Sequence, residues 1–259
     1  MGLDVYVGTL TRYLVGDWEL ATEQFAREAG IELSVVRANP EPEDAITDPD
    51  VVRDAVLDWR RAYERELGVE FSWAEADDMP YFTDKPDWSG YFGLLFLAAH
   101  DEHPDVPLPD ELPEEPTGHP LLERVLGQPK RGLFRRAREP EAERRYFALY
   151  GPELWLPVDA DATWRGPFLN GEELEMSSIG SLLAQLRDLA RRLGADDDEL
   201  ARWRSQDDRP VAGSFEVDGQ TFQELGRATL LDEGRFGLAV FLDLAERAVE
   251  HRLPVKLDY

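Results

Sequence analysis

Residues 3–37, LDVYVGTLTRYLVGDWELATEQFAREAGIELSVVR, contain the pattern from which the fold class is predicted. β-Branched and aromatic residues are concentrated over residues 3–9, which is typical of a strand. Apolar residues recur at helical spacing over residues 17–29, and Gly30 is a typical helix stop. Residues 31–37 return to a strand-like pattern. This order of strand, helix and strand predicts an α/β protein with a small, mostly parallel sheet, and a mixed α+β class is the alternative.

The rest of the first half predicts further helices around this opening. Asp48 followed by Pro49 is a typical helix start, and the predicted helix runs to residue 67 before Gly68. Residues 69–73 form a third predicted strand. Residues 88–100 are apolar on nearly every face of a helix, which predicts a helix buried at the centre of the protein.

The second half predicts helices plus short hairpins. Ser178 is a good N-cap for one of the helices, because its hydroxyl can accept from the first free backbone amides. Strands are predicted at 153–158 with a hairpin partner at 162–168, and a tight hairpin is predicted over 215–222. Further elements are predicted as helices at 121–126, 179–193, from residue 196 and at 236–252, and as a last strand at 254–259.

A proline-rich acidic stretch separates the two halves. Six of the 18 prolines lie between residues 104 and 120, which argues against a regular helix or a central strand there. The predicted organisation is an α/β lobe at 1–103, a linker or loop at 104–120 and a helical lobe with short strands at 121–259. A single domain is the alternative.

The composition excludes several classes of protein. The 259 residues contain no cysteine, which excludes disulfides and thiol chemistry. No apolar run approaches the roughly 20 residues that a membrane-spanning helix needs. The N-terminal segment carries charged residues where a signal peptide would be apolar. We therefore expect a cytoplasmic protein.

The net charge of -26 is concentrated in the first half of the chain. Residues 70–115 contain 13 acids against one lysine, a net charge of -12. Such a charge repels nucleic acid and anionic membranes, and it attracts basic proteins. We expect a basic protein partner and neither a nucleic acid nor a membrane. The alternative is that the acidity only keeps the protein soluble, as in salt-adapted proteins.

Aromatic residues stand among the acids of this stretch. Acids supply electrostatic steering and aromatic side chains supply buried anchors, a mixture found at protein interfaces. The alternative is that the aromatic side chains pack beneath the loop as a satellite of the core. The residues expected to bind the partner are Asp77, Asp78, Tyr81, Phe82, Asp84, Asp87, Glu114 and Glu115.

A second candidate site follows the first predicted strand. Ligands of open α/β sheets bind at the carboxyl ends of the strands, and Thr9, Thr11, Arg12 and Tyr13 stand at that point. Hydroxyls beside an arginine predict a pocket for a small anion. The alternative is that Arg12 pairs with a neighbouring acid such as Asp17.

The sequence contains no complete catalytic or metal-binding motif. His100 and His103 are spaced to share a helix face, and His119 or an acid would have to complete a metal site. Pro104 ends the helix at this point, so that a solvated helix terminus explains the two histidines as well. Neighbouring carboxylates are frequent in a chain with 54 acids, and their distances are unknown from sequence. We expect no metal, no cofactor and no catalytic residues.

Three functions remain after these exclusions. The first is a non-enzymatic binding or inhibitor protein that docks a basic protein, by analogy in charge with small acidic inhibitors such as bacterial immunity proteins. The second is a carboxylate-based hydrolase, with or without a metal. The third is a salt-adapted domain without a charged partner.

Overall fold

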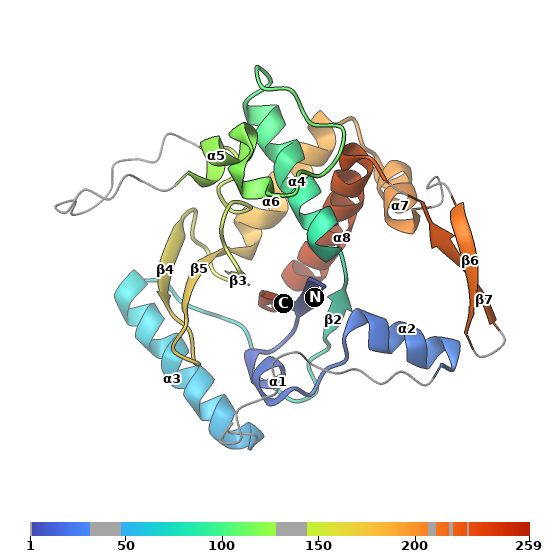
Figure 1. The fold of residues 1–259 in the computed structure, drawn as a ribbon. Helices are drawn as coiled ribbons and strands as arrows, with labels where there is room; N and C mark the ends of the chain where they lie inside the picture. Colours follow the sequence, from blue (N-terminus) through green and yellow to red (C-terminus); the bar gives the residue numbers. More distant parts are fainter. Residues whose placement is uncertain (1, 32–47, 128–143, 207–210, 218–219, 227) are drawn as a thin grey trace.

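The computed structural model describes residues 2–31, 48–127, 144–206, 211–217, 220–226 and 228–259. Within these ranges one six-stranded sheet has the order β2-β1-β8-β3-β5-β4 (Figure 1). The strands of this sheet are β1 (Asp4–Val7), β2 (Phe82–Asp84), β3 (Leu154–Leu156), β4 (Thr163–Pro167), β5 (Glu173–Ser178) and β8 (Val255–Asp258). A separate hairpin consists of β6 (Val211–Val217) and β7 (Gln220–Leu225), which confirms the hairpin predicted in this region.

The sheet is mixed and mostly antiparallel. Only β3 and β5 run parallel, while the other neighbouring strands of this sheet are antiparallel. The prediction of a mostly parallel sheet is therefore wrong, whereas the mixed α+β class is confirmed. The order of strand, helix and strand at the N-terminus predicted a parallel neighbour for β1. Its neighbours are instead β2 and the C-terminal β8, and both are antiparallel to it. The strand predicted at 31–37 lies outside the described residues except for Ile31.

Two other strand predictions are corrected by the sheet. Residues 69–73 form no strand, although Phe71 and Trp73 are buried against the sheet. Their alternating pattern reflects an extended segment that packs on one face of the sheet without joining it. The segment predicted to pair with residues 153–158 is β4, which pairs instead with β5. Short connections of similar length, residues 157–162 and 168–172, flank β4, so its spacing in the sequence does not decide which neighbouring strand it joins.

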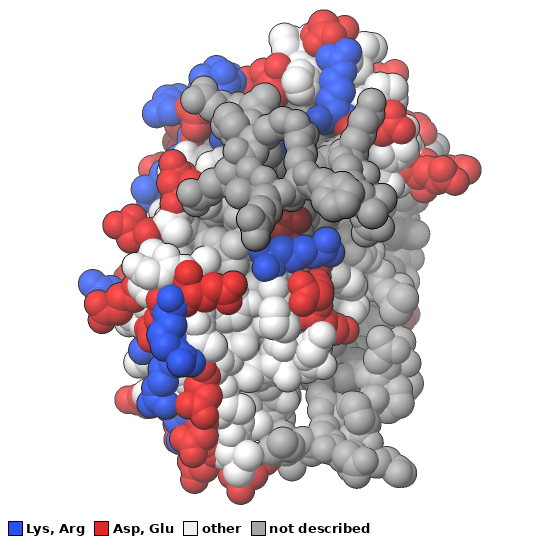
Figure 2. Space-filling model, turned by 90° about the vertical axis from the view of Figure 1, so that its left-hand side faces the viewer, with Lys and Arg blue, Asp and Glu red and all other residues white. Residues whose placement is uncertain are grey.

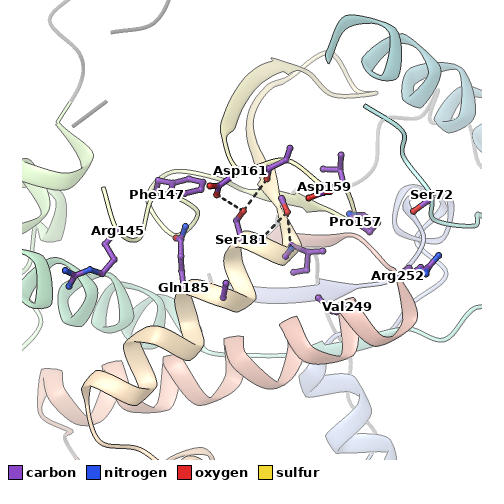
Figure 3. Close-up of a pocket in the computed structure, with 16 residues that line it drawn as sticks. Ser72, Arg145, Phe147, Pro157, Asp159, Asp161, Ser181, Gln185, Val249 and Arg252 are labelled. Carbon is purple, nitrogen blue, oxygen red and sulfur yellow. Dashed lines mark hydrogen bonds between the residues drawn. The ribbon is translucent and has the colours of Figure 1, made fainter. Parts of the chain in front are cut away.

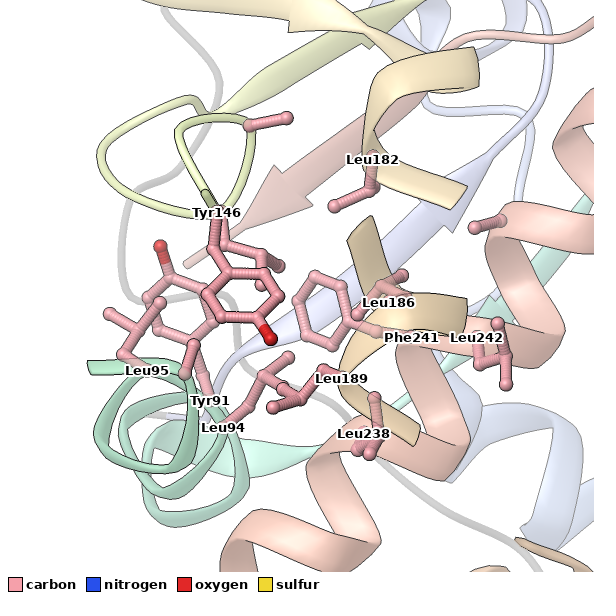
Figure 4. Packing of buried hydrophobic residues seen from close by; sticks show 14 of the residues in the cluster. Tyr91, Leu94, Leu95, Tyr146, Leu182, Leu186, Leu189, Leu238, Phe241 and Leu242 are labelled. Atoms are coloured by element: carbon pink, nitrogen blue, oxygen red, sulfur yellow. The ribbon is translucent and has the colours of Figure 1, made fainter. Parts of the chain in front are cut away.

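Helices cover both faces of the sheet. The helices are α1 (Leu10–Val15), α2 (Ala21–Ala29), α3 (Pro49–Leu67), α4 (Asp87–Glu102), the 3₁₀ turn η1 (Pro116–Gly118), α5 (Pro120–Leu126), α6 (Ile179–Arg192), α7 (Asp197–Ser205) and α8 (Leu230–His251). The larger hydrophobic core lies between one face and α4, α6 and α8 (Figure 4). A smaller core on the opposite face contains residues of α3, β3 and β5. Strand alternation produces this division, since Val5 and Val7 face the larger core and Leu154 and Leu156 face the smaller one.

The buried central helix predicted at 88–100 is α4, and its prediction is confirmed. Residues 93–99 are all buried in it. It crosses α8 at very close range, because the backbones meet at glycines. A Cβ atom at Gly237 would lie 2.1 Å from the carbonyl oxygen of Gly90, and one at Gly93 would lie 2.5 Å from the amide nitrogen of Gly234. The two helices run antiparallel, and their sequences at the crossing differ at one residue only, GYFGL over 90–94 and GRFGL over 234–238.

The proline-rich segment at 104–120 packs against the protein. Val106, Leu108 and Leu112 lie against the larger core, and the amide of Leu230 donates to the carbonyl of Asp110 at 2.9 Å. Strands from the segments on both sides of this stretch belong to the one sheet. No helix among the described residues is long and apolar enough to span a membrane.

Candidate functional site

Charges on the described surface are extensively paired. Acids and arginines interleave over the side of the molecule that carries α3 and β4 (Figure 2). On α3, Arg53 pairs with Asp50 at 2.8 Å, and Arg61 pairs with Asp58 at the same distance. An acid paired in this way contributes little to the attraction of a partner. The carboxylates most able to attract a basic partner are therefore those that form no ion pair within the protein.

The expected partner-binding residues are used in part by the protein itself. Asp77 forms an ion pair with Arg53, and Asp84 forms one with Arg204 at 2.7 Å. Asp87 lies 3.8 Å from Lys85. The remaining acids of this set, Asp78, Glu114 and Glu115, are exposed.

The two aromatic residues of the set lie against cations of the same chain. The guanidinium of Arg12 lies 5.2 Å from the ring centroid of Tyr81. The ring of Phe82 packs against His251, with centroids 5.3 Å apart, and beneath Arg247 at 4.9 Å. Both rings are half-buried, and Phe82 packs against the larger core. This arrangement agrees with the alternative prediction, in which the aromatic side chains pack beneath the loop as a satellite of the core.

Three of the four residues of the predicted anion pocket come together. Thr9, Thr11 and Arg12 line a cavity of about 340 Å³, whose wall also contains Arg53. The Arg12 guanidinium donates to the carbonyl oxygens of Met79 at 2.5 Å and Asp77 at 2.7 Å. Its Nε also lies 3.6 Å from Asp17, the neighbour named as the alternative.

The backbone amides at this cavity already carry a carboxylate. Glu75, which is 7% exposed, accepts hydrogen bonds from the amides of Leu10 at 3.1 Å and Thr11 at 2.8 Å. It also accepts from the indole of Trp73. A small anion could therefore bind these two amides only by displacing Glu75. Tyr13 lies elsewhere and donates to Asp258 at 2.8 Å.

His100 and His103, the two candidate metal ligands, lie at the end of α4. Nδ1 of His100 lies 2.9 Å from the carbonyl oxygen of Val106, and His103 follows the last turn of α4. Within the described residues, no group of three or more histidines and carboxylates is arranged to hold a metal ion.

A cavity of about 740 Å³ lies where β3 and β5 end and α6 begins (Figure 3). The predicted cap of α6 is confirmed, since the Ser178 hydroxyl accepts from the amides of Gly180 and Ser181. Ser181 in turn donates to Asp161 at 3.3 Å. Two arginines and two aspartates line the cavity, so its charges balance: Arg145, Arg252, Asp159 and Asp161.

A second cavity, of about 480 Å³, has an excess of acids, and we refer to it as the acidic cleft. It lies between α1, the start of β3, the turn from β4 to β5 and the end of β8. Its carboxylates are Glu153, Glu172, Glu173 and Asp258, and its other polar or aromatic side chains are Tyr13, Phe168, Asn170, Lys256 and Tyr259. None of the four carboxylates forms an ion pair with a described residue.

Hydrogen bonds hold three of these carboxylates in place. Glu153 accepts from the hydroxyl of Tyr259 at 2.6 Å, and Asn170 donates to Glu172 at 2.7 Å. Tyr13 donates to Asp258, as described above. Burial first, and then the charge of Asp258, raise the pKa of the Tyr13 hydroxyl, which keeps it a proton donor. The cleft is therefore ordered, negatively charged and partly aromatic.

Strand and turn geometry place these residues. Val255 and Leu257 face the larger core, so that Lys256 and Asp258 face the other side of the sheet, where α1 lies. The turn before β5 is closed by the amide of Phe168, which donates to the carbonyl of Glu172 at 2.7 Å. Gly171 in this turn has a φ of 84°, a conformation that favours glycine.

Sequence reasoning missed the acidic cleft and Glu75. The cleft draws residues from positions 13, 153, 172 and 258, which no local motif connects. One signal was available, since Lys256 interrupts an apolar segment, and a lysine within a buried strand requires an explanation. Comparison with protein-family models, with curated proteins and with solved structures finds no match to this chain.

Proposed function

We propose that this protein is a non-enzymatic binding protein that docks a basic protein partner at the acidic cleft. The observation that carries the proposal is the set of four carboxylates there, which form no ion pair with a described residue although many acids elsewhere do. In a chain of net charge -26, such a concentration of unpaired acids is unfavourable until a cation approaches.

The chemistry of the cleft favours an arginine or lysine side chain. Carboxylates accept charge-assisted hydrogen bonds from such a group, and two carboxylate oxygens can bind one guanidinium. The rings of Tyr13, Phe168 and Tyr259 provide faces for the cation and its alkyl stem. A concave site with aromatic walls and charged groups resembles the pockets that hold interface hot spots.

The mode of action is inhibition or sequestration of the partner, by analogy in charge with small acidic inhibitors. The negative field of the whole molecule would accelerate encounter, and the cleft would provide the specific contact. The acids expected from the sequence would then act in steering, because Asp77 and Asp84 already have arginine partners.

Three double variants with the same change of charge test the proposal. The cleft pair is Glu172→Gln with Glu173→Gln, and the comparison pairs are Asp78→Asn with Asp87→Asn and Glu114→Gln with Glu115→Gln. All six side chains are exposed, so the fold should be unaffected. Stopped-flow association would be measured with a hexa-arginine peptide, and with any basic protein captured from the source cells at low salt and then purified.

We expect the cleft pair to slow association by about five- to tenfold and to flatten its salt dependence, and the comparison pairs to slow it less than about twofold. Equal effects of all three pairs would mean that only net charge matters and that the cleft is not the docking site. Failure to bind any basic probe at low salt would contradict the binding function itself.

A further inference from the structure

Lys256 differs from the other cations described above because it combines burial with the lack of a carboxylate partner among the described residues. It lies in the middle of β8 and is 7% exposed, yet it forms no ion pair with a described residue. Its Nζ donates to the carbonyl oxygen of Leu257 at 2.6 Å. Burial of a lysine without a carboxylate partner costs stability, because the ammonium loses its hydration. Such a residue requires an explanation beyond the fold.

The amine belongs to the acidic cleft. Lys256 lines the cavity of about 480 Å³, and its Nζ lies 5.8 Å from the ring centroid of Tyr259, another lining residue. On the neighbouring strands its register partners are Tyr6 and Leu154. The carboxylates whose charge acts on it are Glu153, Glu172 and Asp258.

The surroundings favour the neutral amine. Burial lowers the pKa of Lys256, and this effect outweighs Glu153, Asp258 and Glu172, whose charges act in the opposite direction. The neutral amine is the nucleophilic form of lysine. The composition adds a second argument, since the chain uses 25 arginines and only three lysines. An arginine at this position would remain charged, whereas a lysine can lose its proton.

We propose that Lys256 is a nucleophilic amine that captures a small neutral or cationic aldehyde in the acidic cleft as an imine. The nitrogen lone pair attacks the carbonyl carbon and forms the C–N bond, while the carbonyl π electrons move to the oxygen. Protons pass from the nitrogen to that oxygen, and loss of one water molecule leaves the C=N bond. The Tyr259 hydroxyl, hydrogen-bonded to Glu153, is a group of the same cavity that can transfer the proton.

The walls of the cleft define the class of aldehyde. Four carboxylates repel an anionic compound, and the rings of Tyr13, Phe168 and Tyr259 favour a flat apolar one. An uncharged aromatic aldehyde therefore fits best. This inference goes beyond the docking of a basic partner and does not depend on it, because the imine forms on the amine and the carboxylates affect only which aldehyde is favoured.

Reductive trapping on the full chain tests the inference. The folded protein would be incubated near pH 7 with benzaldehyde or 4-carboxybenzaldehyde and cyanoborohydride, and labelled lysines would be quantified by peptide mapping. Lys85, half-buried and 3.8 Å from Asp87, is the internal reference. We expect benzaldehyde to label Lys256 faster than Lys85, because the lowered pKa of Lys256 leaves more of its amine in the neutral, nucleophilic form.

Controls separate a reactive site from ordinary lysine chemistry. In the urea-unfolded chain the difference between the lysines should vanish, and Lys85→Arg should leave labelling of Lys256 unchanged. Benzaldehyde should be preferred over 4-carboxybenzaldehyde at Lys256 more strongly than in the unfolded chain. The Glu172→Gln and Glu173→Gln pair should weaken that preference and retain benzaldehyde labelling. Labelling of Lys256 no faster than Lys85 in the folded chain would overturn the inference, whatever the outcome of the docking experiment.

Discussion

At the scale of the residue, Glu75 connects two parts of the chain. Its buried carboxylate binds the first amides of α1 and the indole of Trp73, so that α1 is held against the extended segment 69–76. A carboxylate accepts hydrogen bonds at both oxygens, which an amide side chain does not. The position therefore requires an acid, and this acid is unavailable to any partner of the protein.

Replacement of Glu75 by glutamine should destabilise the protein. The amide presents an N–H group where an acceptor is needed, so that one buried donor of the protein loses its partner. We expect the free energy of unfolding to fall by about 2 kcal/mol, the usual range for hydrogen bonds to a charged group. Urea titration measures it. Asp78→Asn removes a carboxylate three residues further along the chain, at an exposed position, and should change stability by less than about 0.5 kcal/mol. Equal effects of the two variants would contradict this role of Glu75.

At the scale of the element, the glycine crossing of α4 and α8 determines how closely the two longest apolar helices pack. Glycine lowers the stability of an isolated helix by about 1 kcal/mol relative to alanine. Four glycines at one crossing are therefore unfavourable for the separate helices. Close packing of the helices offsets this cost, since a Cβ atom at Gly93 or Gly237 would meet the backbone of the partner helix.

Gly237→Ala should lower stability although alanine favours helices. The added methyl group would lie 2.1 Å from the Gly90 carbonyl oxygen, so that the helices must separate. We expect a loss of at least about 2 kcal/mol in urea unfolding, since overpacked cores lose about 1–3 kcal/mol and more where backbone must move. Gly180→Ala is the matched control, because the nearest atom to an added methyl group there is the Ser178 hydroxyl at 3.4 Å, an ordinary contact distance. The control should be neutral or slightly stabilising. Tolerance of Gly237→Ala would show that the crossing is looser than described.

At the scale of the whole molecule, a net charge of -26 opposes the compact state through repulsion among the acids. The ion pairs on α3 and at Arg204 reduce this repulsion locally. In the acidic cleft the repulsion among the four carboxylates is not reduced by ion pairs with described residues. The dependence of stability on salt therefore distinguishes ordinary self-repulsion from the salt-adapted alternative.

Sodium chloride should raise the melting temperature mainly at low concentration. The Debye length falls from about 30 Å at 0.01 M to about 10 Å at 0.1 M, which screens most repulsion across the molecule. We expect the gain to level off above about 0.2 M. The cleft pair Glu172→Gln and Glu173→Gln should show a smaller gain in a calorimetric series. A protein that folds only in molar salt would support the salt-adapted domain instead.

The sequence by itself determined the principal helices. Residues 49–67 were predicted as a helix and form α3, and the predicted helix at 179–193 is α6. Ser178 caps α6 as expected, and the apolar helix at 88–100 is buried as α4. These predictions were confirmed because helix caps, stops and apolar periodicity are local signals, carried by residues within a few turns of each other.

Only the tertiary structure decided the strand order and the acidic cleft. The sequence predicted a last strand, but its place between β1 and β3 follows from pairing with residues about 250 and 100 positions away. The orientation of β3 and β5, and the approach of Tyr13 to Asp258, follow in the same way. A short strand can pair with many others of similar pattern, and the cores on both faces of the sheet together select one order. Side chains distant in sequence become neighbours only after that selection, which is why no local motif announced Lys256 or the carboxylates around it.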